Sequence, residues 1–281
     1  MNKKQIVVIV AVVAIMGYLY SLPVKGLVKP KETRTNTAGV ASGTRQAASI
    51  TVASVSALAA PSLDPTSAQQ ITTLENKLKD ASDAEKLSIQ KQLATQWDKA
   101  NQPAPAAFYY MDVAHNSNAM ADWLNAGNRF NAAYKLTQDT TSQVAFNSNA
   151  VEAFEHATKL QPANLEAKTG LGVAYVNGGG MPMQGIALLL EVVKLEPKNH
   201  EALLNLGMFS MKSGQFAKAV ERFKTMIAIK EEVEPYFYLA ESYKQLGQKQ
   251  EAIAAYEKCK ELMGDPAAGQ RIDEYIKELK K

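Results

Sequence analysis

Apolar residues recur at spacings of three and four along most of the chain from Pro65 onward, which is the period of helices that bury one face. No stretch of the sequence alternates apolar and polar residues convincingly, as a half-buried strand does. The segments DPTS at 64–67 and DASDAE at 80–85 supply side chains that cap the first turn of a helix. The pattern therefore predicts an all-α fold.

The first 24 residues have a different pattern. An apolar run extends from Ile6 to Val24 behind two lysines, and roughly 17 to 20 residues suffice to cross the hydrocarbon core of a bilayer. A cleaved signal peptide would need small residues just after this run, where the sequence has the bulky GYLYSL of residues 17–22. The pattern favours an uncleaved transmembrane signal anchor at residues 1–24.

Positive charges flank the apolar run on both sides, and their balance alone slightly favours a cytoplasmic body. A short charged tail that leads directly into an apolar run is, however, typical of a bacterial signal anchor, which exports the segment behind it. We therefore expect a single-pass protein of the bacterial inner membrane with a periplasmic soluble part. A cytoplasmic soluble part is the alternative.

Residues 25–63 are rich in Ala, Ser, Thr and Val, carry few charges and lack a helical apolar period. Such a segment buries too little surface to offset the entropy of ordering, so we predict a flexible linker. A short helix near ASVSALAA, at residues 53–60, is the one exception that the pattern allows. Residues 64–83 then form a helical lead-in.

Two segments near the C-terminus align with each other at an offset of 33 residues. NHEALLNLGMFSMKSGQFAKAVERFKTMIAI begins at residue 199, and EPYFYLAESYKQLGQKQEAIAAYEKCKELM begins at residue 234. The aligned positions, each 33 residues apart, are Leu206-Gly207 with Leu239-Ala240, Ala219 with Ala252, and Phe223 with Tyr256. This pattern resembles the tetratricopeptide repeat (TPR) family, whose repeats of about 34 residues carry Leu-Gly-x-x-Tyr, Ala-x-x-x-Phe and Pro at similar places.

Earlier units follow the same pattern less closely. One has Leu171-Gly172 in its first helix and Gly185 in its second. In the unit before it, the spacing from Gly127 to Ala150 exceeds the standard by 11 residues. Eleven residues are almost three helical turns, so both helices can lengthen while keeping their faces. A degenerate unit is expected from residue 84.

The resemblance implies a TPR-type solenoid of helical hairpins, in which small residues let paired helices approach and large ones fill the space between repeats. The amphipathic segment at the C-terminus is predicted to be the capping helix that a solenoid needs. The predicted organisation is a transmembrane anchor at 1–24, a flexible linker at 25–63, a helical lead-in at 64–83, TPR-like repeats at 84–264 and a capping helix at 265–281.

Four glycines and a proline interrupt the helical pattern within residues 174–192. GMPMQG at 180–185 matches the first half of a phosphate-binding loop, but Ile186-Ala187 stands where the lysine and the hydroxyl residue should follow. The spacing between helix-packing positions is one residue longer here than in the next two units. We therefore predict an expanded turn, whose glycines tolerate positive φ angles.

Candidate metal ligands are scattered. None of the three histidines, His115, His156 and His200, has a partner at metal-ligand spacing, and Cys259 is predicted to be a buried, inert thiol. Four methionines, Met181, Met183, Met208 and Met211, have the soft chemistry that copper(I) prefers, although methionine more often fills gaps or contacts peptides. We expect no catalytic residue, cofactor or metal, and so no enzymatic activity.

In TPR proteins the first helix of each repeat lines the inner surface, so the resemblance implies a peptide-binding groove there. Only Asn128 matches the Lys/Asn/Arg clamp that some TPR domains use for a chaperone's C-terminal carboxylate. Most other positions are apolar, so we expect the groove to bind an amphipathic helix or apolar peptide. The predicted groove residues are Asn128, Thr169, Val173, Val176, Leu204, Met208, Met211, Phe237, Glu241 and Lys244.

The formal net charge is only +3, and no basic run follows residue 35, so we expect no nucleic-acid partner. The leading hypothesis is a membrane-tethered scaffold that binds a protein or peptide in envelope assembly, secretion or folding. One alternative is a homo-oligomerisation module whose groove is filled by another copy. The other, by analogy of fold alone, is an accessory factor for the maturation of a cytochrome or copper centre.

Overall fold

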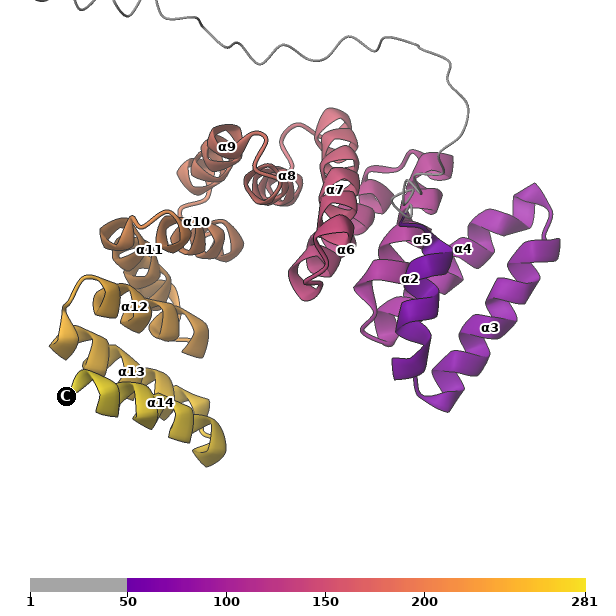
Figure 1. The fold of residues 1–281 in the computed structure, drawn as a ribbon. Coiled ribbons are helices and arrows are strands. Elements are labelled where there is room, and N and C mark those ends of the chain that lie inside the picture. The colour runs from indigo at the N-terminus through magenta and orange to yellow at the C-terminus, as the bar shows by residue number, and fades with distance from the viewer. Residues whose placement is uncertain (1–49) are drawn as a thin grey trace, which may run out of the picture. The chain divides into compact units, whose positions relative to one another are not determined.

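The computed structural model describes residues 50–281, and the predicted anchor at 1–24 lies outside them. All regular secondary structure in this part of the chain is helical (Figure 1), and no helix in it is long and apolar enough to cross a bilayer. The elements are α2 (Val52–Ala59), the 3-10 helix η1 (Ala60–Ser62), α3 (Pro65–Asp80), α4 (Asp83–Lys99), α5 (Pro103–Ser117), α6 (Met120–Leu136), α7 (Thr140–Leu160), α8 (Leu165–Asn177), α9 (Pro182–Leu195), α10 (His200–Lys212), α11 (Phe216–Ile229), α12 (Val233–Gln245), α13 (Lys249–Met263) and α14 (Pro266–Leu279).

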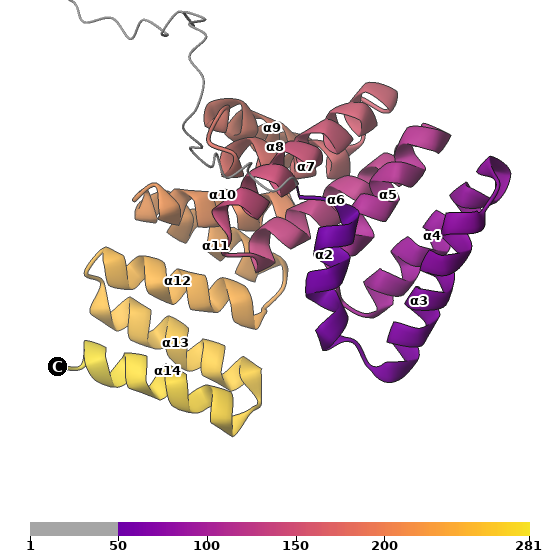
Figure 2. The same cartoon turned by 45° about the vertical axis from the view of Figure 1, so that its right-hand side comes forward.

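The helices from α3 to α14 form hairpins that follow one another in chain order (Figures 1 and 2). Each of these helices contacts the next one in the chain, and the first helices of consecutive hairpins, α6, α8, α10 and α12, contact each other in succession. Contacts confined to neighbouring units are the mark of a repeat solenoid. The prediction of an all-α solenoid is confirmed.

Contacts between a glycine and a phenylalanine explain how closely the paired helices approach each other. A Cβ atom added at Gly207 would lie 2.6 Å from the ring of Phe223, and one added at Gly127 would lie 2.8 Å from the ring of Phe154. Phe154 also fills the space beside Gly170 of the next hairpin, where an added Cβ would lie 2.2 Å from its ring. No side chain larger than hydrogen fits at these three positions without movement.

The short helix that the pattern allowed near residues 53–60 is present as α2, and with η1 it occupies residues 52–62 of the predicted linker at 25–63. Val55 and Ala59 of α2 are buried, and α2 packs against α5 rather than against its neighbour in sequence. Thr51 caps the helix, since its hydroxyl accepts a hydrogen bond of 3.2 Å from the Ser54 N–H. The helix has only 8 residues, about two turns, which is too short to establish an apolar period in the sequence.

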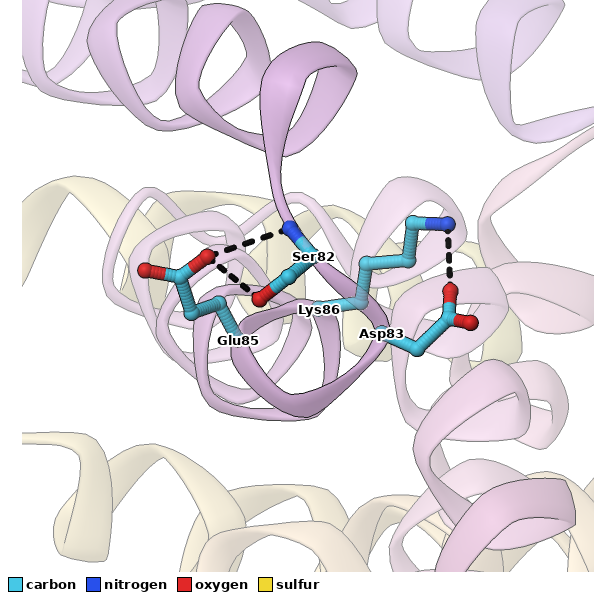
Figure 3. A network of polar contacts seen from close by, with 4 residues as sticks. All are labelled: Ser82, Asp83, Glu85 and Lys86. Carbon is cyan, nitrogen blue, oxygen red and sulfur yellow. Dashed lines mark hydrogen bonds and ion pairs between the residues drawn. The ribbon is translucent and has the colours of Figure 1, made fainter.

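The predicted caps of α3 and α4 are present. Asp64 accepts hydrogen bonds from N–H groups in the first turn of α3, and Pro65 occupies the first position of that helix. At the start of α4, the Ser82 N–H and hydroxyl both donate to one oxygen of Glu85, at 3.1 and 2.6 Å (Figure 3). Asp83 and Lys86 form an ion pair of 2.8 Å beside them. These polar side chains fix where α3 and α4 begin.

Candidate protein-binding surfaces

A strip of partly exposed apolar side chains lies along the first helices of the C-terminal hairpins. Leu204, Met208 and Met211 are spaced four and three residues apart on α10, so they share one face of the helix. Phe237 on α12 and Val176 on α8 are half-buried like them. These five side chains are the part of the predicted groove that retains both apolar character and access to solvent.

Two of the predicted groove residues, Thr169 and Val173, are not on a surface, and this corrects the prediction. Their exposed fractions are only 1% and 2%. Val173 packs in a core cluster with Leu189 and Leu206, on α9 and α10. The reason is the position of α8, which contacts α6, α7, α9 and α10 and so buries its middle residues, 169–174.

The polar residues of the predicted groove on α12, Glu241 and Lys244, form contacts with other side chains of the same chain. The Tyr256 hydroxyl donates to the Glu241 carboxylate, and burial together with this carboxylate raises the pKa of Tyr256. Lys244 lies 3.8 Å from Glu241, and its ammonium group is 5.5 Å from the centre of the Tyr275 ring. Glu241 and Lys244 therefore tie α12 to α13 and to the terminal helix α14.

Asn128, which matches a position of the carboxylate clamp, also forms a hydrogen bond within the chain. Its amide nitrogen donates to Glu166 at 2.8 Å, which connects α6 to α8. A similar bond of 3.2 Å runs from the Asn131 amide to the Gly170 carbonyl. Between α10 and α12, His200 and Glu232 lie 2.8 Å apart. Polar residues of the first helices thus hold consecutive hairpins together, and Asn128 is one of them.

The glycine run forms the turn between α8 and α9. Residues 178–181 separate these helices, whereas only residues 213–215 separate α10 from α11 and 246–248 separate α12 from α13. The extra residue confirms the predicted expansion. Gly179 has a φ angle of +69°, close to the +75° and +73° of the single glycine in each of the other two turns. The turn is therefore a lengthened form of its neighbours, and Gly179 provides the left-handed conformation.

The candidate histidine and cysteine ligands do not gather in the part of the chain that the structure describes. No group of three or more His, Cys, Asp or Glu side chains there is arranged to hold a metal ion. His156 stacks on the indole of Trp123, with 4.2 Å between ring centres, and His115 lies 3.4 Å from Glu152. Cys259 is buried beside the Val233 carbonyl, and this burial raises the pKa of its thiol.

The sequence interpretation missed several grooves among the described residues, and none of the three described below is lined by a residue of the first-helix strip. One groove of about 490 Å³ lies between α2 and α3, with Trp97 and Tyr109 among its lining residues. A second, also of about 490 Å³, lies between α7 and the α8–α9 turn. A third, of about 320 Å³, lies where α2, the start of α5 and the α6–α7 turn meet.

Signals for the second of these grooves were present in the sequence. The 11 extra residues between Gly127 and Ala150 lengthen the helices that form one wall, and the expanded glycine turn forms the other. Each anomaly by itself predicts only a local change of length. Their proximity follows from the stacking of consecutive hairpins, which brings the turns at one end of the hairpins close together.

Comparison with known proteins supports the fold. Residues 233–266, which include α12 and α13, match the tetratricopeptide repeat model, and a search of curated proteins found no match. Among solved structures, TTC0263, a thermophilic TPR protein of Thermus thermophilus, is similar at 18% identity and a TM-score of 0.52 over 67% of this chain and 97% of that one. Two structures of MamA have 20% identity and TM-scores of 0.48 and 0.49, over 66% and 63% of this chain and 96% and 97% of theirs. The chain therefore contains a tetratricopeptide repeat, and its described part has the helical-hairpin fold of TPR proteins.

Proposed function

We propose that the chain is a membrane-tethered scaffold that binds an amphipathic helix or apolar peptide of a partner protein. The observation that carries this proposal is the apolar strip of Val176, Leu204, Met208, Met211 and Phe237 on the first helices. A strip of this kind suits helix-in-groove recognition, in which apolar side chains at spacings of three and four enter a partner's surface. The fold is compatible with a protein-interaction scaffold, because repeats stacked in one direction present extended surfaces.

The tether follows from the apolar run between Ile6 and Val24, which has the length and composition of a bilayer-spanning helix. In this proposal the repeats lie on the periplasmic side of a bacterial inner membrane, where they act in envelope assembly, secretion or folding. Protease added to intact spheroplasts tests the orientation. Digestion of the repeats in intact spheroplasts supports export, whereas protection until the membrane is lysed places the repeats in the cytoplasm.

The apolar strip is tested by changing Met208, its central residue on α10, to Glu. Crosslinking in native membranes first identifies a partner of the unaltered chain. We expect Met208→Glu to reduce copurification of that partner about tenfold or more, because a carboxylate buried against an apolar surface lacks a partner.

Leu195→Glu is the matched control, since Leu195 is an exposed apolar residue on the second helix α9. It introduces the same charge outside the strip and should leave copurification unchanged. An unchanged thermal melt shows that the Met208→Glu chain is folded. If such a folded variant retained the partner as well as the unaltered chain, the strip would not be the binding surface.

A further inference from the structure

The hairpin α6–α7 protrudes beyond the repeats that follow it, on the side of its turn. Its helices have 17 and 21 residues, against 13 and 14 in both α8–α9 and α10–α11. Gly127 and Gly207 are each the eighth residue of their helix, but Phe154 is the fifteenth of α7 and Phe223 the eighth of α11. The equivalent glycine–phenylalanine contacts thus place the extra length at the C-terminal end of α6 and the N-terminal end of α7. At 1.5 Å per residue, α7 gains roughly 10 Å there.

Three of the four most exposed large apolar side chains, Leu58, Leu136 and Val144, lie on this protruding tip or in a groove beside it. Leu136 and Val144, on the tip itself, are each 72% exposed, while Leu58 on α2 and Met183 in the first turn of α9 are 80% and 77% exposed. No other large apolar side chain among the described residues is as exposed as these four. Single exposed apolar residues are common, but a gathering of them marks an interaction site.

Two grooves flank the tip, and α7 forms a wall of both. The groove of about 490 Å³ on the α8 side contains Val144, Val151 and Met181. The groove of about 320 Å³ on the α2 side contains Leu58, Leu136 and Phe146. Both volumes fall within the range of about 300–1,000 Å³ that is typical of ligand-binding pockets.

Neither groove is lined by an Asp, Glu, Lys, Arg or His side chain. A charged group that entered them would lose hydration without gaining an oppositely charged side chain, which is unfavourable. Basic side chains, which membrane-surface helices use to contact anionic lipids, are also lacking from both linings. The linings therefore favour an uncharged segment of a protein over a charged peptide or a lipid surface.

The α8-side groove also has polar atoms suited to a peptide backbone. Asn147 packs against the turn so closely that a Cβ at Gly178 would lie 2.3 Å from its amide nitrogen. Among the described residues, the Asn147 amide oxygen has no hydrogen-bond partner, and neither do the N–H groups of Gly180 and Met181. The half-buried Asn147 side chain lines this groove, and the two N–H groups are donors for carbonyl oxygens.

We propose that the tip of α6–α7, with its two flanking grooves, binds an extended, uncharged peptide segment of a partner protein. Apolar side chains of the segment enter the two grooves. Its backbone bonds to the Asn147 amide and to the glycine turn. The site is separate from the first-helix strip and does not depend on it.

The test uses random 12-residue peptides displayed on phage and selected on the full chain. The selected peptides are then synthesised with a fluorescein label, and their affinities are measured by polarisation. We expect uncharged central residues with at least one large apolar side chain. Replacing that side chain with Asp should abolish binding, because the carboxylate would be desolvated without a partner.

Variants of the chain locate the binding site. Val144→Glu and Leu136→Glu, one for each groove, change exposed residues and should each weaken binding about tenfold or more. Met208→Glu, in the first-helix strip, and Leu195→Glu, on α9, should leave it unchanged. The proposal is overturned if Val144→Glu binds the peptides as tightly as the unaltered chain, or if Met208→Glu alone abolishes binding. It is equally overturned if sedimentation shows a dimer that Val144→Glu converts to a monomer, because a second copy would then occupy the grooves.

Discussion

The hairpins α6–α7 and α10–α11 share their inner contact but differ in length and in what they present to solvent. In each, a glycine of the first helix faces a fully buried phenylalanine of the second. In α6–α7 the added turns lie beyond this contact, where they do not disturb the packing. An insertion at the turn side of a repeat can therefore create a new surface while the solenoid keeps its spacing.

Phe154 of the long hairpin packs both within its own hairpin and against the next one. Its ring fills the space beside Gly127 in its own hairpin and beside Gly170 in the next. The hydrogen bonds that the side-chain amides of Asn128 and Asn131 donate to Glu166 and to the Gly170 carbonyl join the same two hairpins. The boundary between the long hairpin and the shorter repeats is thus a tightly packed interface.

The largest effect is expected for Phe154→Ala. Loss of a fully buried phenylalanine should lower the free energy of unfolding by about 3–5 kcal/mol, through lost burial and the cavity left behind. Since Phe154 contacts both hairpins, amide hydrogen exchange measured by mass spectrometry should rise in α6, α7 and α8 together.

Phe223→Ala is the matched control, since it removes the same ring from the standard hairpin α10–α11. Its effect on exchange should centre on α10 to α12, because Phe223 also stacks on Tyr238, with 5.5 Å between ring centres. If the two variants changed exchange in the same helices, the solenoid would unfold as one unit and the two regions could not be distinguished.

The sequence allowed prediction of the repeats that keep the regular spacing. Positions such as Gly207 and Phe223 carry small and large residues at a fixed offset, and this offset follows from two helices packing at close range. The expanded turn was predictable for the same reason, because one added residue shifts the offset. Residue types at fixed spacing thus predict contacts within a hairpin.

Contacts between non-consecutive elements were not predictable in this way. Helix α2 packs against α5, and no periodic signal in its 8 residues indicates that partner. The burial of Thr169 and Val173 depends on the helices that surround α8, such as α9 and α10 around Val173, which a count along one repeat does not include. Each groove beside α7 is lined by several elements, so a count along one repeat does not predict it either.

A smaller effect is expected for Gly170→Ala, at the interface with Phe154. An added methyl group 2.2 Å from the ring forces a shift of packed side chains, which costs about 1–3 kcal/mol in a core. Alanine is favoured over glycine in a helix by up to about 1 kcal/mol, so the net change should remain destabilising. Urea unfolding followed by circular dichroism measures it.

Gly180→Ala serves as its control in the neighbouring turn. An added Cβ there meets nothing within 4 Å, and Gly180 does not have a positive φ angle. The midpoint of urea unfolding should therefore change little or rise slightly, because alanine restricts the unfolded chain. If both substitutions lowered stability equally, the close contact between Gly170 and Phe154 would not be the cause of the loss.

The smallest expected effect concerns how the helices of the two regions begin. Asn164 and Asn199 cap α8 and α10 through their side-chain oxygens, which do not titrate. Asp139 caps α7, and its hydrogen bonds to Ser142 hold the pKa of the Asp139 carboxyl below its ordinary value. The ionised form is thus favoured by folding. Its stabilisation is fully present above the unfolded pKa of about 3.9 and is lost as the pH falls through the lower folded value.

Asp139→Asn gives α7 the same kind of cap as α8 and α10, and it should therefore remove this pH dependence. We expect the variant and the unaltered chain to have similar urea midpoints at pH 7, because aspartate and asparagine cap about equally well. Between pH 4 and pH 2 the unaltered chain should lose slightly more stability than the variant, and amide exchange at the start of α7 should rise more at equal pH. If both chains lost the same stability over this interval, the Asp139 cap would not distinguish the long hairpin from the standard repeats.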